Sequence, residues 1–134
     1  MLTGRCACGA VRFELIGAPV DAGYCHCHRC QHRTGTAASL VALVPRADFT
    51  VVAGEDAIRW WEPDGGKAKA FCVHCGGHLF SGRLDGDAPL AVRFGAFDAD
   101  PGIRPRWRQW VGSAVSWEAI PDDGLPRHAG GRPG

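Results

Sequence analysis

Seven cysteines dominate the reactive chemistry of this 134-residue sequence, and they fall into three short clusters. The clusters are Cys6-Ala7-Cys8-Gly9, Cys25-His26-Cys27-His28-Arg29-Cys30 and Cys72-Val73-His74-Cys75-Gly76. Thiolates two or three positions apart can point at one ion, as metal-binding turns require, and an odd number of cysteines cannot all pair as disulfides within one chain. The spacing therefore predicts bound metal rather than buried free thiols. Zinc is the expected ion because it is borderline-soft and accepts tetrahedral sulfur.

Seven sulfur ligands divide naturally into a group of four and a group of three. Cys25, Cys27 and Cys30 are close enough in sequence to hold one ion, which leaves the first and third clusters to share another. In a competing division, Cys27 and Cys30 join Cys72 and Cys75 as a zinc ribbon, although the 41 intervening residues exceed the usual ~15–20. A closed four-sulfur site only stabilises a fold, whereas three protein ligands with an exchangeable fourth position are typical of catalytic zinc.

The segments around the clusters have the apolar patterns of short strands, punctuated by 19 glycines and 9 prolines, which predicts a mainly β fold class. The expected strands are Ala10–Leu15, Val20–Tyr24, Ala37–Val44, Phe49–Ala53, Ile58–Trp61, Lys67–Phe71, Leu79–Arg83, Leu90–Phe94 and Arg106–Gly112. Helical turns are expected only at Arg29–Thr34 and Arg46–Asp48. Adjacent Trp60 and Trp61 must face opposite sides of their strand, so one of them is expected to be exposed.

Length and composition indicate one folded domain, residues 1–126, followed by a flexible tail, 127–134, in a Gly- and Pro-rich end of the chain. The net charge of +1 argues against binding to nucleic acid or an anionic membrane surface, both of which favour a basic excess. No apolar run approaches the ~20 residues that span a bilayer. The first residues lack the apolar segment of a secretory signal, so a cytoplasmic location with reduced thiols is expected.

The order Cys-x-Cys-Gly, Cys-His-Cys-x-x-Cys and Cys-x-x-Cys-Gly resembles the family of glutathione-dependent formaldehyde-activating enzymes and centromere protein V. Further landmarks agree from about Gly4 to Pro126, namely Gly35, Val44-Pro45, Leu79-Phe80 and Trp117. The resemblance implies a β-tent fold, in which small antiparallel sheets are joined by a long-range four-cysteine zinc site. It assigns Cys6, Cys8, Cys72 and Cys75 to that structural zinc. It assigns Cys25, Cys27 and Cys30 to a second, more labile catalytic zinc.

The activity that the resemblance implies is that of a carbon–sulfur lyase acting on thiol adducts of small aldehydes, through the open position of the three-cysteine zinc. The expected partner is a small thiol such as glutathione, or its formaldehyde adduct, and the chain is expected to be a monomer or a homodimer. His26 and His28 flank this cluster. They are the candidate catalytic proton carriers, because imidazole titrates near neutral pH.

Two other classes of function fit the same cysteines. In one, both zinc ions are structural and the surface of a non-catalytic module binds a protein or another partner. In the other, the three-cysteine cluster exchanges zinc or oxidises, as in a redox or metal-buffering protein. Metal content, followed by activity on pairs of thiol and aldehyde, distinguishes these classes from an enzyme.

Overall fold

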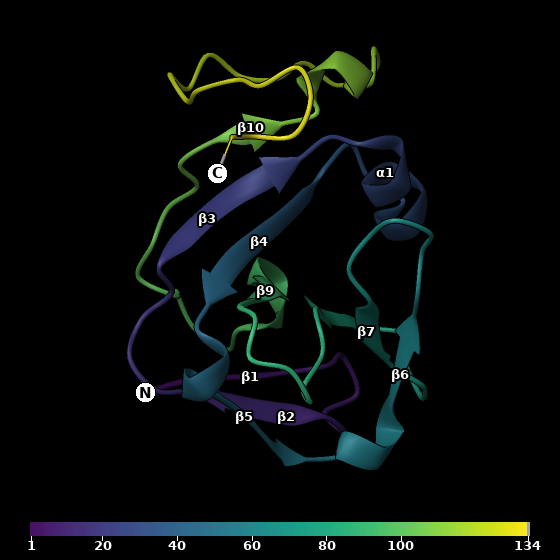
Figure 1. Ribbon diagram of the computed structural model, residues 1–134, viewed down its shortest axis with the longest axis vertical. Helices are drawn as coiled ribbons and strands as arrows, with labels where there is room; N and C mark the ends of the chain where they lie inside the picture. The colour runs from purple at the N-terminus through teal and green to yellow at the C-terminus, as the bar shows by residue number, and fades with distance from the viewer. Residues whose placement is uncertain (134) are drawn as a thin grey trace. The chain divides into compact units, whose positions relative to one another are not determined.

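The computed structural model describes residues 1–133, which form short strands and one α-helix (Figure 1). The expected mainly β class is confirmed. The chain divides into two compact units, the first made of Met1–Val20 and Ala42–Ile103 and the second of Asp21–Val41 and Arg104–Gly134. Gly134 lies outside the described residues. Among those described, no helix combines the length and apolarity needed to cross a bilayer.

The first unit contains two sets of antiparallel strands (Figure 1). One is a three-stranded sheet in the order β1 (Leu2–Arg5), β2 (Arg12–Leu15) and β5 (Phe49–Ala53). The other pairs β6 (Ile58–Trp61), β7 (Lys69–Cys72), β8 (His78–Ser81) and β9 (Leu90–Arg93) in that order. Short 3-10 turns lie at Arg46–Asp48, Glu55–Ala57 and Phe94–Ala96.

An aromatic core fills the first unit. Phe13 lies on the inward face of β2, and its ring centroid is 4.9 Å from that of Phe49 on β5 and 5.7 Å from that of Phe97. Phe49 in turn packs edge-on against Phe80 of β8 at 5.3 Å. Tilted and edge-on ring pairs of this kind add stabilisation beyond the apolar area they bury. The core therefore fixes the three-stranded sheet against β8, and with it the turns that carry four of the cysteines.

The second unit is built around β3 (Asp21–Cys25), α1 (His28–Thr34) and β10 (Arg108–Gln109), with a 3-10 turn at Val111–Ser113. β10 pairs with β3 in parallel, placing Arg108 opposite Tyr24 and Gln109 opposite Cys25. The sheets are thus mixed rather than purely antiparallel. A parallel pair is possible here because the chain between β3 and β10 is long enough for a crossover. β4 (Ser39–Val44) begins in the second unit and ends in the first.

Each strand expected from the sequence is present, and Phe49–Ala53 and Ile58–Trp61 have the expected bounds. The helical turn expected at Arg29–Thr34 begins one residue earlier, as α1. β1 was not expected, because Leu2–Arg5 has one aliphatic residue and a glycine. As expected for neighbours on a strand, Trp61 is 44% exposed, whereas Trp60 is half-buried and donates its indole N–H to the carbonyl of Gly82 at 3.0 Å.

The segment expected to be a flexible tail contacts β10 over its described part, residues 127–133. The backbone N–H of His128 donates to the carbonyl of Arg108 at 2.9 Å, and that of Arg132 donates to the side-chain carbonyl of Gln109 at 3.1 Å. The Arg132 guanidinium also pairs with the Asp21 carboxylate at 2.9 Å. The boundary at residue 126 stays a prediction.

Gly54 provides a test of the close approach between the strands of the first unit. Its φ of 75° is left-handed, and a Cβ added there would overlap the carbonyl oxygen of Ala10. We expect Gly54→Ala to lower the free energy of unfolding by at least about 2 kcal/mol, because it combines backbone strain with steric overlap. Urea unfolding measures this. Gly86→Ala is the matched control, because a Cβ there meets no atom within 4 Å, and equal losses in the two variants would contradict the prediction.

Candidate metal centres

Four cysteines of the first unit converge although they come from two turns that lie far apart in the sequence. Cys6 and Cys8 lie in the turn after β1, whereas Cys72 ends β7 and Cys75 lies in the turn before β8. Their four Sγ atoms all lie within 4.8 Å of one another. The Sγ atom of Cys8 is 3.7 Å from that of Cys6 and 3.8 Å from that of Cys72, far beyond the ~2.05 Å of a disulfide bond.

The four sulfurs are carried by two tight turns. In each turn a glycine N–H donates to the carbonyl of a cysteine, and another backbone N–H donates to a cysteine sulfur. In the first turn, the N–H of Gly9 donates to the carbonyl of Cys6, and the N–H of Val11 donates to the Cys6 sulfur at 3.3 Å. In the second, the N–H of Gly76 donates to the carbonyl of Cys72 at 2.8 Å, and that of Gly77 donates to the Cys75 sulfur at 3.4 Å. Backbone donors aimed at sulfur favour its thiolate form, which is the form that binds metal.

The thiol pKa values of this group are spread apart. The backbone N–H groups of Cys8 and Gly77 lower the pKa of Cys75 to about 6. The pKa of Cys8 is raised to about 11, because burial and the neighbouring sulfurs outweigh the lowering effect of the Ala10 N–H. Burial raises the pKa of Cys6, but the Val11 N–H and the sulfurs of Cys72 and Cys8 more than offset it, so the net shift is downward. Closely spaced thiolates repel one another. The group therefore keeps some of its thiol protons unless a bound cation replaces them.

The donor set of this group fits a tetrahedral metal ion. Four sulfurs at the corners of a tetrahedron with ~2.3 Å zinc–sulfur bonds lie about 3.8 Å apart, and the closest observed separations are 3.7 and 3.8 Å. The group is also complete, because it offers four ligands from four residues. It can therefore hold one ion without a ligand from solvent.

Three cysteines of the second unit form a separate group. Cys25 is the last residue of β3, Cys27 is the N-cap of α1, and Cys30 lies in the first turn of α1. The backbone N–H of Cys30 donates to the Cys27 sulfur at 3.3 Å, and the three Sγ atoms lie within 4.8 Å of one another. Cys25 is buried, whereas Cys27 and Cys30 are half-buried. Within residues 1–133 this group holds three ligands, not four.

The two histidines that the sequence singled out lie in different surroundings. His26 is only 3% exposed, and its Nε2 atom is 3.1 Å from a guanidinium nitrogen of Arg108. A guanidinium can only donate, so Nε2 accepts and the imidazole is neutral. Burial lowers the pKa of His26, and the charges of Arg108 and Arg127 lower it further. His28, the first residue of α1, is exposed to solvent.

Sequence reasoning missed Arg108, which is only 6% exposed. Its guanidinium donates twice to one carboxylate oxygen of Asp123, at 2.9 and 3.1 Å, and lies 4.0 Å from the centre of the Tyr24 ring. With His26 and Tyr24 it lines a cavity of about 290 Å³. No local pattern distinguishes this arginine from the other arginines of the chain, because its partners come from distant segments.

Comparison with known proteins identifies a family whose profile spans all three cysteine clusters. The family profile described as glutathione-dependent formaldehyde-activating enzyme matches residues 1–113, which include all three cysteine clusters. The chain belongs to this family. The resemblance seen in the cysteine motifs is thereby confirmed.

Two relatives bear the family's name as a provisional assignment. A protein of Penicillium rubens is 31% identical over 88 residues, which cover 64% of this chain and 46% of the relative. A protein of Halomonas elongata is 30% identical over 108 residues, covering 66% of this chain and 69% of the relative. The chain thus spans about half the length of the Penicillium relative and two thirds of the Halomonas relative.

A solved structure shares the fold of this family member. The crystal structure of a Rhodobacter sphaeroides protein aligns with a TM-score of 0.59 and covers 94% of this chain and 98% of the other. Sequence identity is 23%, so this match speaks to the fold alone.

The two sulfur groups should differ in their effect on stability. We expect Cys75→Ser to unfold or strongly destabilise the protein, because a structural metal ion binds with a free energy of order 10 kcal/mol that is coupled to folding. Cys27→Ser should leave a folded chain, because its group lies within six consecutive positions, 25–30. Circular dichroism during thermal unfolding measures both. Equal losses would mean that both groups are structural.

The Arg108–Asp123 pair should stabilise the second unit. Asp123→Asn removes the carboxylate and leaves the buried guanidinium without its charged partner, which is costly, so we expect a lower urea midpoint at pH 7. Asp122→Asn is the matched control, since Asp122 is an exposed neighbour of the same charge. A midpoint equally low, or equally unchanged, in the two variants would show that the pair contributes nothing specific.

Proposed function

We propose that this family member is a zinc-dependent carbon–sulfur lyase that acts on adducts of a glutathione-like thiol with a small aldehyde. The observation that carries this proposal is the unequal number of ligands. Cys6, Cys8, Cys72 and Cys75 form a complete set of four, whereas Cys25, Cys27 and Cys30 form a set of three. Three protein ligands and an exchangeable position are typical of catalytic zinc.

In this proposal the four-cysteine group holds a structural zinc and the three-cysteine group a labile one. A zinc ion at the three-cysteine group would supply Lewis-acid chemistry and lower the pKa of a thiol that ligates it. The half-buried Cys27 and Cys30 face partly to solvent, which supports access for a small thiol. The names of the relatives support glutathione as the thiol and formaldehyde as the aldehyde.

The two histidines take different roles in this proposal. His28 is exposed at the start of α1, so it can exchange protons with solvent and is the better candidate for a proton carrier. His26 accepts a hydrogen bond from Arg108 through Nε2. We infer that His26 helps to orient the backbone between Cys25 and Cys27, because its backbone N–H donates to the carbonyl of Gln109 at 2.9 Å and its carbonyl accepts from the Gln31 side chain at 2.7 Å.

A reducing compartment such as the cytoplasm suits this chemistry. All seven cysteines are free thiols in the structure, and free thiols persist where glutathione keeps them reduced. The family's named thiol is abundant in the same compartment. A monomer or a homodimer satisfies the proposal equally, because all the cysteines of each sulfur group come from one chain.

Binding of glutathione tests the proposal directly. The protein is first loaded with zinc until elemental analysis gives two ions per chain, the number expected. We then expect glutathione to bind in calorimetric titration, with X-ray absorption showing an additional sulfur neighbour, because zinc stabilises the thiolate near neutral pH. S-methylglutathione, which has no free thiol, is the matched control ligand.

Two results would contradict the proposal. In one, Cys27→Ser and the wild type bind glutathione equally tightly. In the other, a fourth protein ligand already closes the three-cysteine site and no thiol displaces it. The second result would favour the alternative, a non-catalytic module stabilised by two zinc ions.

A further inference from the structure

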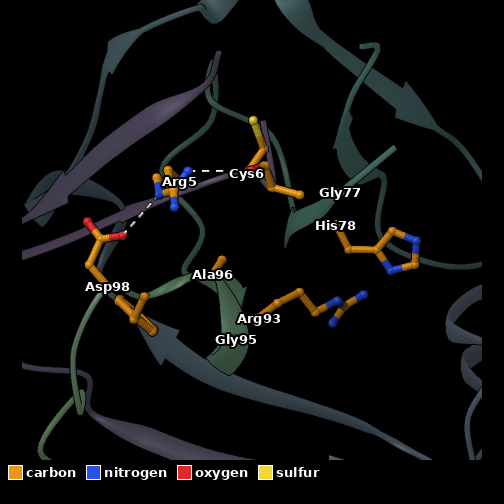
Figure 2. A pocket seen from close by; sticks show the side chains of 10 residues that line it. Arg5, Cys6, Gly77, His78, Arg93, Gly95, Ala96 and Asp98 are labelled. Atoms are coloured by element: carbon orange, nitrogen blue, oxygen red, sulfur yellow. Dashed lines mark hydrogen bonds and ion pairs between the residues drawn. The ribbon is translucent and has the colours of Figure 1, made fainter. Parts of the chain in front are cut away.

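A cavity of about 480 Å³ lies in the first unit, against the four-cysteine group (Figure 2). Its lining includes Arg5, Cys6, His78, Arg93, Phe97 and Asp98. Cavities of ~300–1,000 Å³ are the size in which proteins bind small molecules. The thiol site proposed above belongs to the other unit, and none of its three cysteines lines this cavity.

Two basic side chains, Arg93 and His78, lie together in the lining of the cavity. Figure 2 shows the side chains of His78 and Arg93 extending in the same direction, away from Arg5 and Asp98. The Asp98 carboxylate lies 3.8 Å from the Arg5 guanidinium, so these two charges balance each other. A guanidinium and an imidazole that share one wall favour an anion.

The side chain of Arg93 is held in place by a neighbouring strand of the first unit. Arg93 ends β9 and is half-buried, and one of its terminal nitrogens donates to the hydroxyl of Ser81 at 3.3 Å. Ser81 is itself buried, at 3% exposed, and pairs with Ala91 across β8 and β9. A guanidinium whose position is fixed before binding loses less conformational entropy when it takes up a carboxylate.

The remaining wall is apolar. Ala96 and Phe97 are buried beside the cavity, at 7% and 8% exposed, and Ala7 also lines it. The volume exceeds that of a single carboxylate group, which leaves room for further atoms of a ligand in a cavity that Ala96 and Phe97 also line. An aliphatic chain fits this wall because it buries apolar surface there.

We propose that this cavity binds a small organic acid, with the carboxylate on Arg93 and His78 and a short aliphatic chain against Ala96 and Phe97. The inference goes beyond the proposed thiol chemistry and does not depend on it. The competing explanation is that Arg93 only balances the negative charge of the neighbouring thiolates. That explanation predicts no binding of an added acid.

Titration with butyrate tests the inference. The probe is added to zinc-loaded full-length protein, and the amide resonances of Gly77 and Gly95, which line the cavity, are followed by NMR. We expect saturable shifts that Arg93→Gln weakens about tenfold, the effect of losing one charge-assisted hydrogen bond. Arg59→Gln is the matched control, because Arg59 lies on β6, away from the cavity lining, and donates to the carbonyl of Asp56.

Further variants keep the test decisive if Arg93→Gln fails to fold. Arg93→Lys keeps the charge and should bind butyrate with intermediate affinity, because an ammonium does not reproduce the planar fork of a guanidinium. His78→Gln should weaken binding, whereas Cys27→Ser should leave it unchanged. Thus butyrate binding without glutathione binding would refute the thiol proposal and support the acid site, and the reverse would do the opposite.

Three results would overturn the inference. The first is the absence of saturable shifts in the wild type. The second is equal butyrate affinity in Arg93→Gln and Arg59→Gln. The third is binding of inorganic phosphate as tight as that of butyrate, because the apolar wall would then contribute nothing.

Discussion

The fold of the first unit depends on the convergence of four sulfur atoms from two distant turns. Cys8 and Cys72 are 64 positions apart, yet their sulfurs lie 3.8 Å from each other. Thiolates at this distance repel, and the neighbouring sulfurs help to raise the pKa of Cys8 to about 11, whereas backbone N–H groups lower that of Cys75 to about 6. A cation removes this cost and closes a long loop, which gives a metal ion at this site a large influence on folding.

The convergence of the four sulfurs also determines which strands lie beside them. The turn after β1 must meet the turn between β7 and β8, so β1 and β8 are held close to the same point. Cys6 and His78 consequently border one cavity with Arg93 of β9. The anion site proposed there thus depends on where the four sulfurs meet, and the aromatic core reaches it through the contact of Phe13 with Phe97, whose ring centroids are 5.7 Å apart.

Local features of the sequence were enough to predict the three-cysteine group and most strands. Ligands two or three positions apart share a turn, so the grouping of Cys25, Cys27 and Cys30 needs little tertiary information. The joining of Cys6 and Cys8 with Cys72 and Cys75 does need it, because spacing also allows Cys27 and Cys30 to share an ion with Cys72 and Cys75, and the family resemblance favoured the division that the structure has. Runs such as Phe49–Ala53 are recognisable because aromatic and β-branched residues favour strands. Features that depend on distant partners were missed. Arg108 is buried because Asp123 and Tyr24 surround its guanidinium, and Trp110 takes a left-handed φ of 56° within a segment that hydrogen-bonds to Gly130.

The cysteines of one sulfur group are close in sequence and those of the other are far apart, which implies different roles for the two groups. Cys25, Cys27 and Cys30 meet within one short stretch that ends β3 and starts α1, so little chain entropy is lost when they gather. Under the proposed function, an ion there would add little to folding and could be exchanged without unfolding the chain. The four-sulfur group has the opposite character, since releasing its ion would reopen the loop between two turns. Exchange of the metal ion or of its fourth ligand is therefore compatible with the local group and incompatible with the long-range one. An open coordination position accordingly suits Cys25, Cys27 and Cys30.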